Sequence, residues 1–172
     1  MKKNKGRILL VDDDQAFRTV TSSLLEDEGL SVNTAINAIE GINILGEQSF
    51  DLILSDLMME GMNGLQFLKK IKEQNSDQLV IMVTGFASVN SAVEAMRQGA
   101  YDYLTKPCSN DELVLKVKKA LTSKKEHDEL VSLRSQVVER HKLHNIIGKS
   151  EPMQRVFKLI DQVADCLLYT SD

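Results

Sequence analysis

The chain has 172 residues, of which 27% are charged and 42% are hydrophobic, and its formal net charge is -4. This length allows one full domain and an appendage with a buried core, while the acidic balance excludes the concentrated basic face that direct binding of nucleic acid requires. Two cysteines, Cys108 and Cys166, are too few for a disulfide framework, and no apolar run approaches the roughly 20 residues that span a bilayer, so we expect a cytoplasmic protein with no membrane partner.

Five short apolar runs alternate with amphipathic stretches between residues 7 and 121. Three runs, residues 8–11, 52–54 and 79–83, are continuously apolar, as strands buried on both faces of a sheet must be. Residues 30–35 and 101–104 have the features of edge strands. The alternation predicts an α/β fold, and short right-handed connections favour a flavodoxin-like, doubly wound parallel sheet of five strands in the order 2-1-3-4-5.

Apolar residues recur at helical spacing in the stretches between the strands, and five helices are expected. We predict that each apolar stripe faces the sheet. The stripes are Phe17, Val20 and Leu24; Leu65, Leu68 and Ile71; Val89, Val93 and Met96; and Leu113, Val117 and Leu121.

Polar residues stand at the carboxyl ends of the predicted strands. Asp12, Asp13 and Asp14 follow the first strand, and Asp56 follows the third. Thr84 ends the fourth strand, and the fifth leads through Tyr103 to Lys106 and Pro107. In this fold the carboxyl ends carry the ligand site, at the point where the strand order reverses, so we expect these residues to share one crevice.

The carboxylates predict a metal site. Like charges a few ångströms apart repel one another unless a cation lies between them, and oxygen ligands with room for water suit Mg²⁺. We expect Asp13 and Asp56 to be ligands. Asp14 is better interpreted as a favourable charge in the first turn of a helix.

The same residues predict phosphoryl chemistry. A carboxylate can attack phosphorus to give an acyl phosphate while the metal neutralises charge on the transferring group, and Asp56 is best placed to do so. Lys106 can pair with one phosphoryl oxygen, and the Thr84 hydroxyl can donate a hydrogen bond to another.

Several motifs together resemble the receiver domain of response regulators over residues 7–121. The motifs are Leu9-Leu10-Val11-Asp12-Asp13-Asp14, Ser55-Asp56-Leu57-Met58-Met59, Thr84-Gly85 and Tyr103-Leu104-Thr105-Lys106-Pro107. Their specificity comes from five chemically distinct positions in the right order on the right elements.

The resemblance implies that Asp56 accepts a phosphoryl group from a sensor histidine kinase. It also implies that Asp12, Asp13 and the backbone carbonyl of Met58 help to hold Mg²⁺. Thr84 and Tyr103 would be a switch pair, and the bond between Lys106 and Pro107 would be cis, an isomer that only proline makes readily accessible. Glu60 departs from the pattern, because the family usually has proline there.

A long helix is expected to continue beyond the receiver. From Asp111 to about Lys142 there is no glycine or proline, and at ~1.5 Å per residue this stretch would measure roughly 48 Å. Leu130, Leu133 and Val137 form a short heptad-like seam that could pair with a second copy, so we expect a homodimer.

Residues 145–154, with the amphipathic stretch after them, resemble the opening of the AAA+ ATPase module of sigma-54-dependent activators. No Gly-rich loop ending in Lys-Ser or Lys-Thr is present, so ATP hydrolysis is not assigned to this chain. Sigma-54 RNA polymerase and DNA would be partners only through missing downstream domains. Residues 166–172 fit no continuation of the family and resemble a translated sequencing adapter, which predicts a non-native tail.

We therefore predict a receiver domain (1–122), a linker and dimerisation helix (123–144), the incomplete start of an ATPase module (145–165) and a tail (166–172). The leading interpretation is a non-enzymatic switch that controls a transcriptional activator. A stand-alone receiver that acts as a phosphorelay or adaptor is an alternative. A more remote one is a phosphohydrolase of the haloacid dehalogenase type, suggested by the spacing of Asp12 and Asp14.

Overall fold

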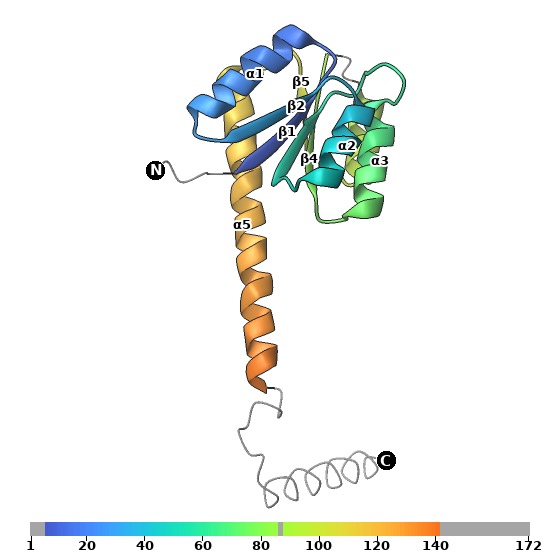
Figure 1. The fold of residues 1–172 in the computed structure, drawn as a ribbon. Coiled ribbons are helices and arrows are strands. Elements are labelled where there is room, and N and C mark those ends of the chain that lie inside the picture. Colours follow the sequence, from blue (N-terminus) through green and yellow to red (C-terminus); the bar gives the residue numbers. More distant parts are fainter. Residues whose placement is uncertain (1–5, 86–87, 142–172) are drawn as a thin grey trace, which may run out of the picture. The chain divides into compact units, whose positions relative to one another are not determined.

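The computed structural model describes residues 6–85 and 88–141 (Figure 1). The strands are β1 (Arg7–Val11), β2 (Ser31–Ala35), β3 (Leu52–Ser55), β4 (Leu79–Thr84) and β5 (Asp102–Thr105). The helices are α1 (Gln15–Asp27), α2 (Ala38–Glu47), α3 (Gly64–Gln74), α4 (Val89–Arg97) and α5 (Asn110–His141). The chain forms two compact units, Met1–His127 and Asp128–Asp172, and the described part of the second unit is the continuation of α5.

All five strands pair in parallel in the order β2-β1-β3-β4-β5, which confirms the predicted fold. The three central strands carry the continuously apolar runs, and Ile8, Ile53 and Ile81 have no exposed surface. These strands are buried because helices cover both faces of the sheet. Side chains that point to either face must therefore be apolar.

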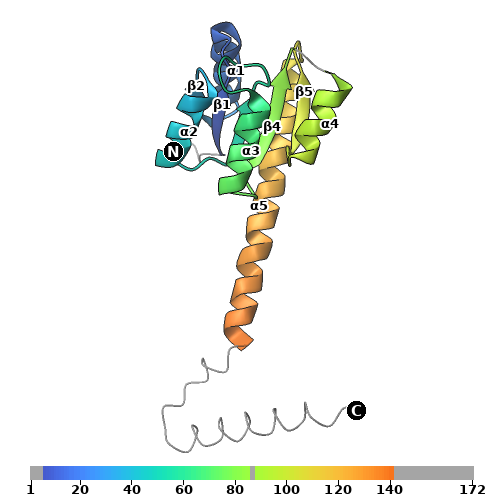
Figure 2. The same ribbon diagram turned by 90° about the vertical axis from the view of Figure 1, so that its right-hand side faces the viewer.

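Two hydrophobic clusters lie on opposite faces of the sheet. One joins alternate residues of the central strands to α2, α3 and α4 and includes Val11, Phe67 and Ala95. The other joins the remaining strand residues to α1 and α5 and includes Leu25 and Val117. Figure 2 looks onto the face covered by α2, α3 and α4.

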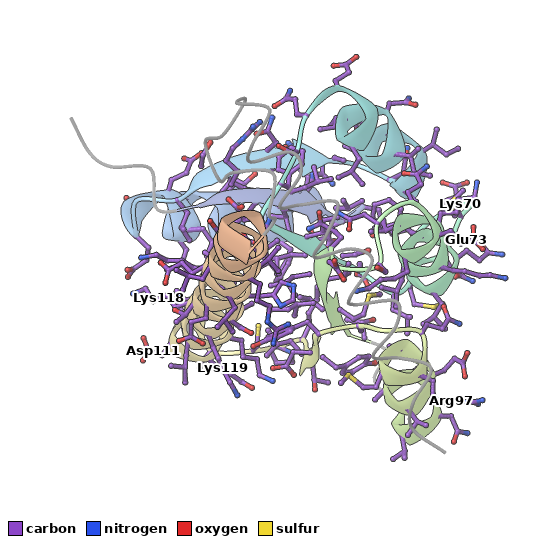
Figure 3. The ribbon with its side chains drawn as sticks, turned by 90° about the horizontal axis from the view of Figure 1, so that it is seen from below. Lys70, Glu73, Arg97, Asp111, Lys118 and Lys119 are labelled. Atoms are coloured by element: carbon purple, nitrogen blue, oxygen red, sulfur yellow. The ribbon has the colours of Figure 1, made fainter. Side chains whose placement is uncertain are left out.

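Charged side chains cover the outer sides of these helices. Figure 3 shows the labelled side chains directed away from the sheet on α3, α4 and α5. They are Lys70, Glu73, Arg97, Asp111, Lys118 and Lys119. Among the described residues, no helix has both the length and the apolar character needed to cross a bilayer.

Side-chain caps fix the starts of α1, α2, α3 and α4. Asp14 is the N-cap of α1, and its carboxylate accepts hydrogen bonds from the N–H groups of Ala16 and Phe17. Reciprocal capping boxes start α3, through Asn63 and Gln66, and α4, through Ser88 and Ser91. Asp14 therefore lies at the N-terminus of a helix, as predicted, but as the N-cap rather than within the first turn.

The predicted apolar stripe on α4 was wrong about which side faces the sheet, and the stripe on α1 was right only in part. On α1, Phe17 and Leu24 pack against the core as predicted, whereas Val20 is exposed and the buried residues are Thr21 and Leu25. On α4 only Ala95 is buried, and the predicted stripe faces solvent. Its members Val89, Val93 and Met96 are 80%, 53% and 50% exposed. Periodicity identifies an apolar stripe but not what covers it, and α4 packs through its small alanine instead.

The predicted stripes on α3 and α5 were right, since Leu68, Ile71, Leu113 and Val117 are buried. Helix α5 begins and ends within one residue of the predicted stretch. Residues 142–144 of the predicted linker, the predicted ATPase start and the predicted tail lie outside the described residues.

Candidate functional site

The sheet brings the predicted site residues together through its backbone hydrogen bonds. The register pairs Val11 of β1 with Ser55 of β3, and the Asp56 N–H continues the ladder by donating to the Val11 carbonyl at 2.9 Å. Lys106 is fixed similarly, since its N–H donates to the Thr84 carbonyl at 2.8 Å. The residues after β1, β3 and β5 thus meet at one edge, as the fold requires.

Lys106 joins the two buried carboxylates of the site. Its ammonium Nζ lies 2.5 Å from Oδ2 of Asp12 and 2.8 Å from Oδ2 of Asp56. The other oxygen of each carboxylate accepts a backbone N–H at 3.0 Å, from Asp14 for Asp12 and from Met58 for Asp56. Both carboxylates are therefore held at two points.

Burial governs the electrostatics of this ion pair. Burial raises the pKa of Asp12 above its ordinary value and outweighs the hydrogen bonds from Lys106 and the Asp14 N–H, which act to lower it. Burial alone would lower the pKa of Lys106, but its hydrogen bonds with Asp12 and Asp56 reverse the direction, and that pKa is raised. The ammonium is thus held in its charged form between the two carboxylates.

The donor atoms fit a hard divalent cation. Asp12, Asp13 and Asp56 each offer a carboxylate oxygen, and these oxygens lie within 4.8 Å of one another. Asp12 and Asp56 are buried, while Asp13 is exposed and gives access from solvent. One lysine charge does not balance three carboxylates, so a cation with oxygen ligands would lower the repulsion among them.

The remaining predicted residues lie around this cluster. The Thr84 side chain is fully buried at the end of β4, and the peptide bond from Lys106 to Pro107 is cis. Tyr103 is partly buried, and its hydroxyl lies 3.1 Å from Oγ of Ser91 on α4. Met58 contributes the N–H described above, and its side chain is exposed. Glu60 is exposed in the loop after β3.

Sequence reasoning missed three contacts around the site. The Phe17 ring lies under the Lys106 ammonium, with Nζ 4.0 Å from the ring centroid. Arg18 donates through Nη1 to the Asp12 carbonyl, and Ser91 contacts Tyr103. The sequence places Phe17 only in an apolar stripe, and no spacing rule relates it to a lysine at position 106.

The sequence pattern of the response regulator receiver domain matches residues 8–118. The chain belongs to this family. Its receiver domain is a regulatory switch of two-component signalling. The matched residues include Tyr103 and Lys106, which the phosphohydrolase alternative would leave without a role.

Relatives of known structure support the assignment. A receiver domain protein described as CheY-like, from Methanospirillum hungatei, is 36% identical with a TM-score of 0.68, over 70% of this chain and 97% of that one. NtrX from Brucella abortus is 31% identical with a TM-score of 0.72, over 92% of this chain and 35% of that one. The similarity to NtrX therefore extends beyond residue 118.

Curated relatives are longer. The DNA-binding transcriptional regulator NtrC of Escherichia coli is 35% identical over 162 residues, which are 93% of this chain and 33% of NtrC. This chain thus spans about a third of the length of the curated relatives that it matches.

Proposed function

We propose that Asp56 accepts a phosphoryl group from a sensor histidine kinase. In this step a carboxylate oxygen of Asp56 forms a bond to phosphorus as the bond from phosphorus to the donor nitrogen breaks, and the nitrogen leaves with the electron pair. The product is a mixed anhydride on Asp56. The observation that carries the proposal is the ammonium of Lys106 at 2.8 Å from the Asp56 carboxylate, where it can neutralise charge on a phosphoryl oxygen.

The surrounding residues would share the remaining tasks. Asp12, Asp13, Asp56 and the carbonyl of Met58 would hold Mg²⁺, which when bound would neutralise negative charge on the transferring group. The buried Thr84 hydroxyl would donate to a phosphoryl oxygen. These roles rest on the family resemblance together with the positions described above.

Mass measurement tests the proposal. The chain is incubated with Mg²⁺ and acetyl phosphate, from which the acetate leaves, and its intact mass is followed. We expect one phosphoryl label on the wild type, none on Asp56→Asn, and normal labelling of Asp77→Asn, which replaces an exposed aspartate before β4. Labelling of Asp56→Asn at the wild-type rate would contradict the proposal.

We further propose that Thr84 and Tyr103 transmit phosphorylation to the surface formed by α4, β5 and α5. Tyr103 is already linked to both helices, because its hydroxyl contacts Ser91 and its carbonyl accepts a hydrogen bond from Lys116 at 3.3 Å. A change of charge at Asp56 would then bias the position of Tyr103 and its neighbours.

The output would be a sigma-54-dependent transcriptional activator of the NtrC type, with its ATPase and DNA-binding domains downstream. Support comes from the similarity to NtrC and NtrX, which extends past the receiver. We propose no ATP hydrolysis by this chain itself. An ATPase loop downstream in the full gene would support this proposal, and a gene ending with the receiver would favour the stand-alone adaptor.

We propose dimerisation through the predicted linker of residues 123–144. Leu130 and Leu133, which are 55% and 58% exposed, form the described part of the seam. Light scattering should find a dimer for the wild type and a monomer for a Leu130→Glu, Leu133→Glu variant. A monomeric wild type at micromolar concentration would refute the seam as a dimer contact.

A further inference from the structure

The Phe17 ring contacts the same Lys106 ammonium that binds the carboxylates of Asp12 and Asp56. Lys106 Nζ is 4.0 Å from the ring centroid, within the range in which the negative face of an aromatic ring attracts a cation. The Lys106 side chain is only 17% exposed, so water screens this attraction only weakly. Two carboxylates and one ring therefore surround the charge.

Local structure holds the ring in place. Phe17 lies in the first turn of α1, and its N–H donates to the N-cap carboxylate of Asp14 at 3.2 Å. Its side chain is partly buried and packs against the apolar cluster between α1, α5 and the sheet. Packing thus restricts the position of the ring, whereas the lysine side chain has four rotatable bonds.

We propose that Phe17 is a positioning residue, which holds the Lys106 ammonium beside Asp56 for the incoming phosphoryl group. This inference rests on the proposed function. Once Asp56 carries the phosphoryl group, its carboxylate is an acyl phosphate, and one of the two anionic partners of Lys106 has changed. The ring is unaltered by that reaction, so it keeps the ammonium within reach of the phosphoryl oxygens in both states.

Replacement of the ring tests the inference. With Mg²⁺ and acetyl phosphate as the probe, we expect Phe17→Leu to label about three- to tenfold more slowly than the wild type, as the loss of one cation–π contact implies. Phe17→Tyr keeps an aromatic face and should label within about twofold of the wild type.

A matched control separates this effect from loss of stability. Phe50 forms the other cation–π contact in the described part of the chain, with Arg7 at 5.2 Å, just before β3 and away from the site. Phe50→Leu removes a comparable contact from the core and should leave the labelling rate unchanged. If Phe50→Leu slows labelling as much as Phe17→Leu does, the inference is overturned.

A double-mutant cycle gives a result that a purely structural role would not. In a Lys106→Gln background there is no ammonium to position, so Phe17→Leu should change the rate by less than about twofold. An equal effect of Phe17→Leu in both backgrounds would overturn the inference. Fluorinated phenylalanines at position 17 test the same contact at nearly constant ring size. Each fluorine reduces the negative charge of the ring face, so each should slow labelling further. Labelling rates that do not follow the number of fluorines would also overturn the inference.

The two proposals fail in different ways. A wild-type chain that takes no label overturns the proposed function and this inference with it. Normal wild-type labelling that depends on Asp56, with an unchanged rate in Phe17→Leu, overturns the inference alone.

Discussion

Gly64→Ala should destabilise the receiver because the start of α3 packs directly on the backbone that carries Asp56. A Cβ at Gly64 would lie 2.1 Å from the Asp56 carbonyl oxygen and 2.8 Å from Cα of Leu57. Both atoms belong to the backbone, so no side-chain rotation relieves the overlap, and the segment must move by about 1 Å. Overpacking of this kind costs about 3 kcal/mol of unfolding free energy.

Gly46→Ala is the matched control, because the same methyl group at this helical position meets nothing within 4 Å. It should stabilise the chain by about 0.5–1 kcal/mol through helix propensity. Urea unfolding followed by circular dichroism gives both values from the shifts of the midpoint at constant slope. A Gly64→Ala variant as stable as the wild type would refute the packing argument, as would equal destabilisation of both variants.

Three further predictions concern charge, capping and metal. Burial alone would raise the pKa of Asp51, but hydrogen bonds from the Arg7 N–H and Lys124 lower this pKa below 3.8. The ionised Asp51 carboxylate therefore stabilises the fold fully above the ordinary carboxyl pKa, and this stabilisation is lost as pH falls through the lower pKa of the folded state. The difference in unfolding free energy between wild type and Asp51→Asn should therefore be largest near neutral pH and disappear in acid; a difference independent of pH would contradict this. Ser91→Ala should weaken the start of α4 by about 1 kcal/mol, since it removes half of a capping box and the contact with Tyr103, and faster hydrogen exchange confined to α4 would show it. Chelation of divalent cations should abolish labelling by acetyl phosphate and restored Mg²⁺ should recover it, whereas labelling in excess chelator would exclude a metal requirement.

The sequence was sufficient for the strand order because two physical signals agreed. Continuous apolar runs such as residues 8–11 mark strands that are buried on both faces, and short connections leave few topologies for them. The sheet order then places Asp12 beside Asp56, and both lie within hydrogen-bonding distance of Lys106. Site residues at strand ends are predictable because the backbone ladder alone positions them.

Contacts set by helix rotation were not predictable in this way. The stripe on α1 contains Val20, which is exposed, whereas the neighbouring Thr21 is buried. The placement of Phe17 under Lys106 depends on the same rotation, which the Asp14 cap and the packing of Leu25 determine together. A one-residue shift of phase turns a helix by roughly 100°, and apolar periodicity alone does not resolve a difference of that size.

The wrong prediction for α4 has a physical consequence for switching. Helix α3 buries Phe67, Leu68 and Ile71, whereas α4 buries only Ala95 among the described residues. Little apolar surface therefore opposes movement of α4, and elements with few buried apolar contacts are the ones that shift or open at low free energy. Its Ser88–Ser91 cap is shared with Tyr103, so a change at the tyrosine reaches the helix at its start. If the proposed phosphorylation of Asp56 acts through Tyr103, we therefore expect α4 to move and α3, held by its buried side chains, to stay in place.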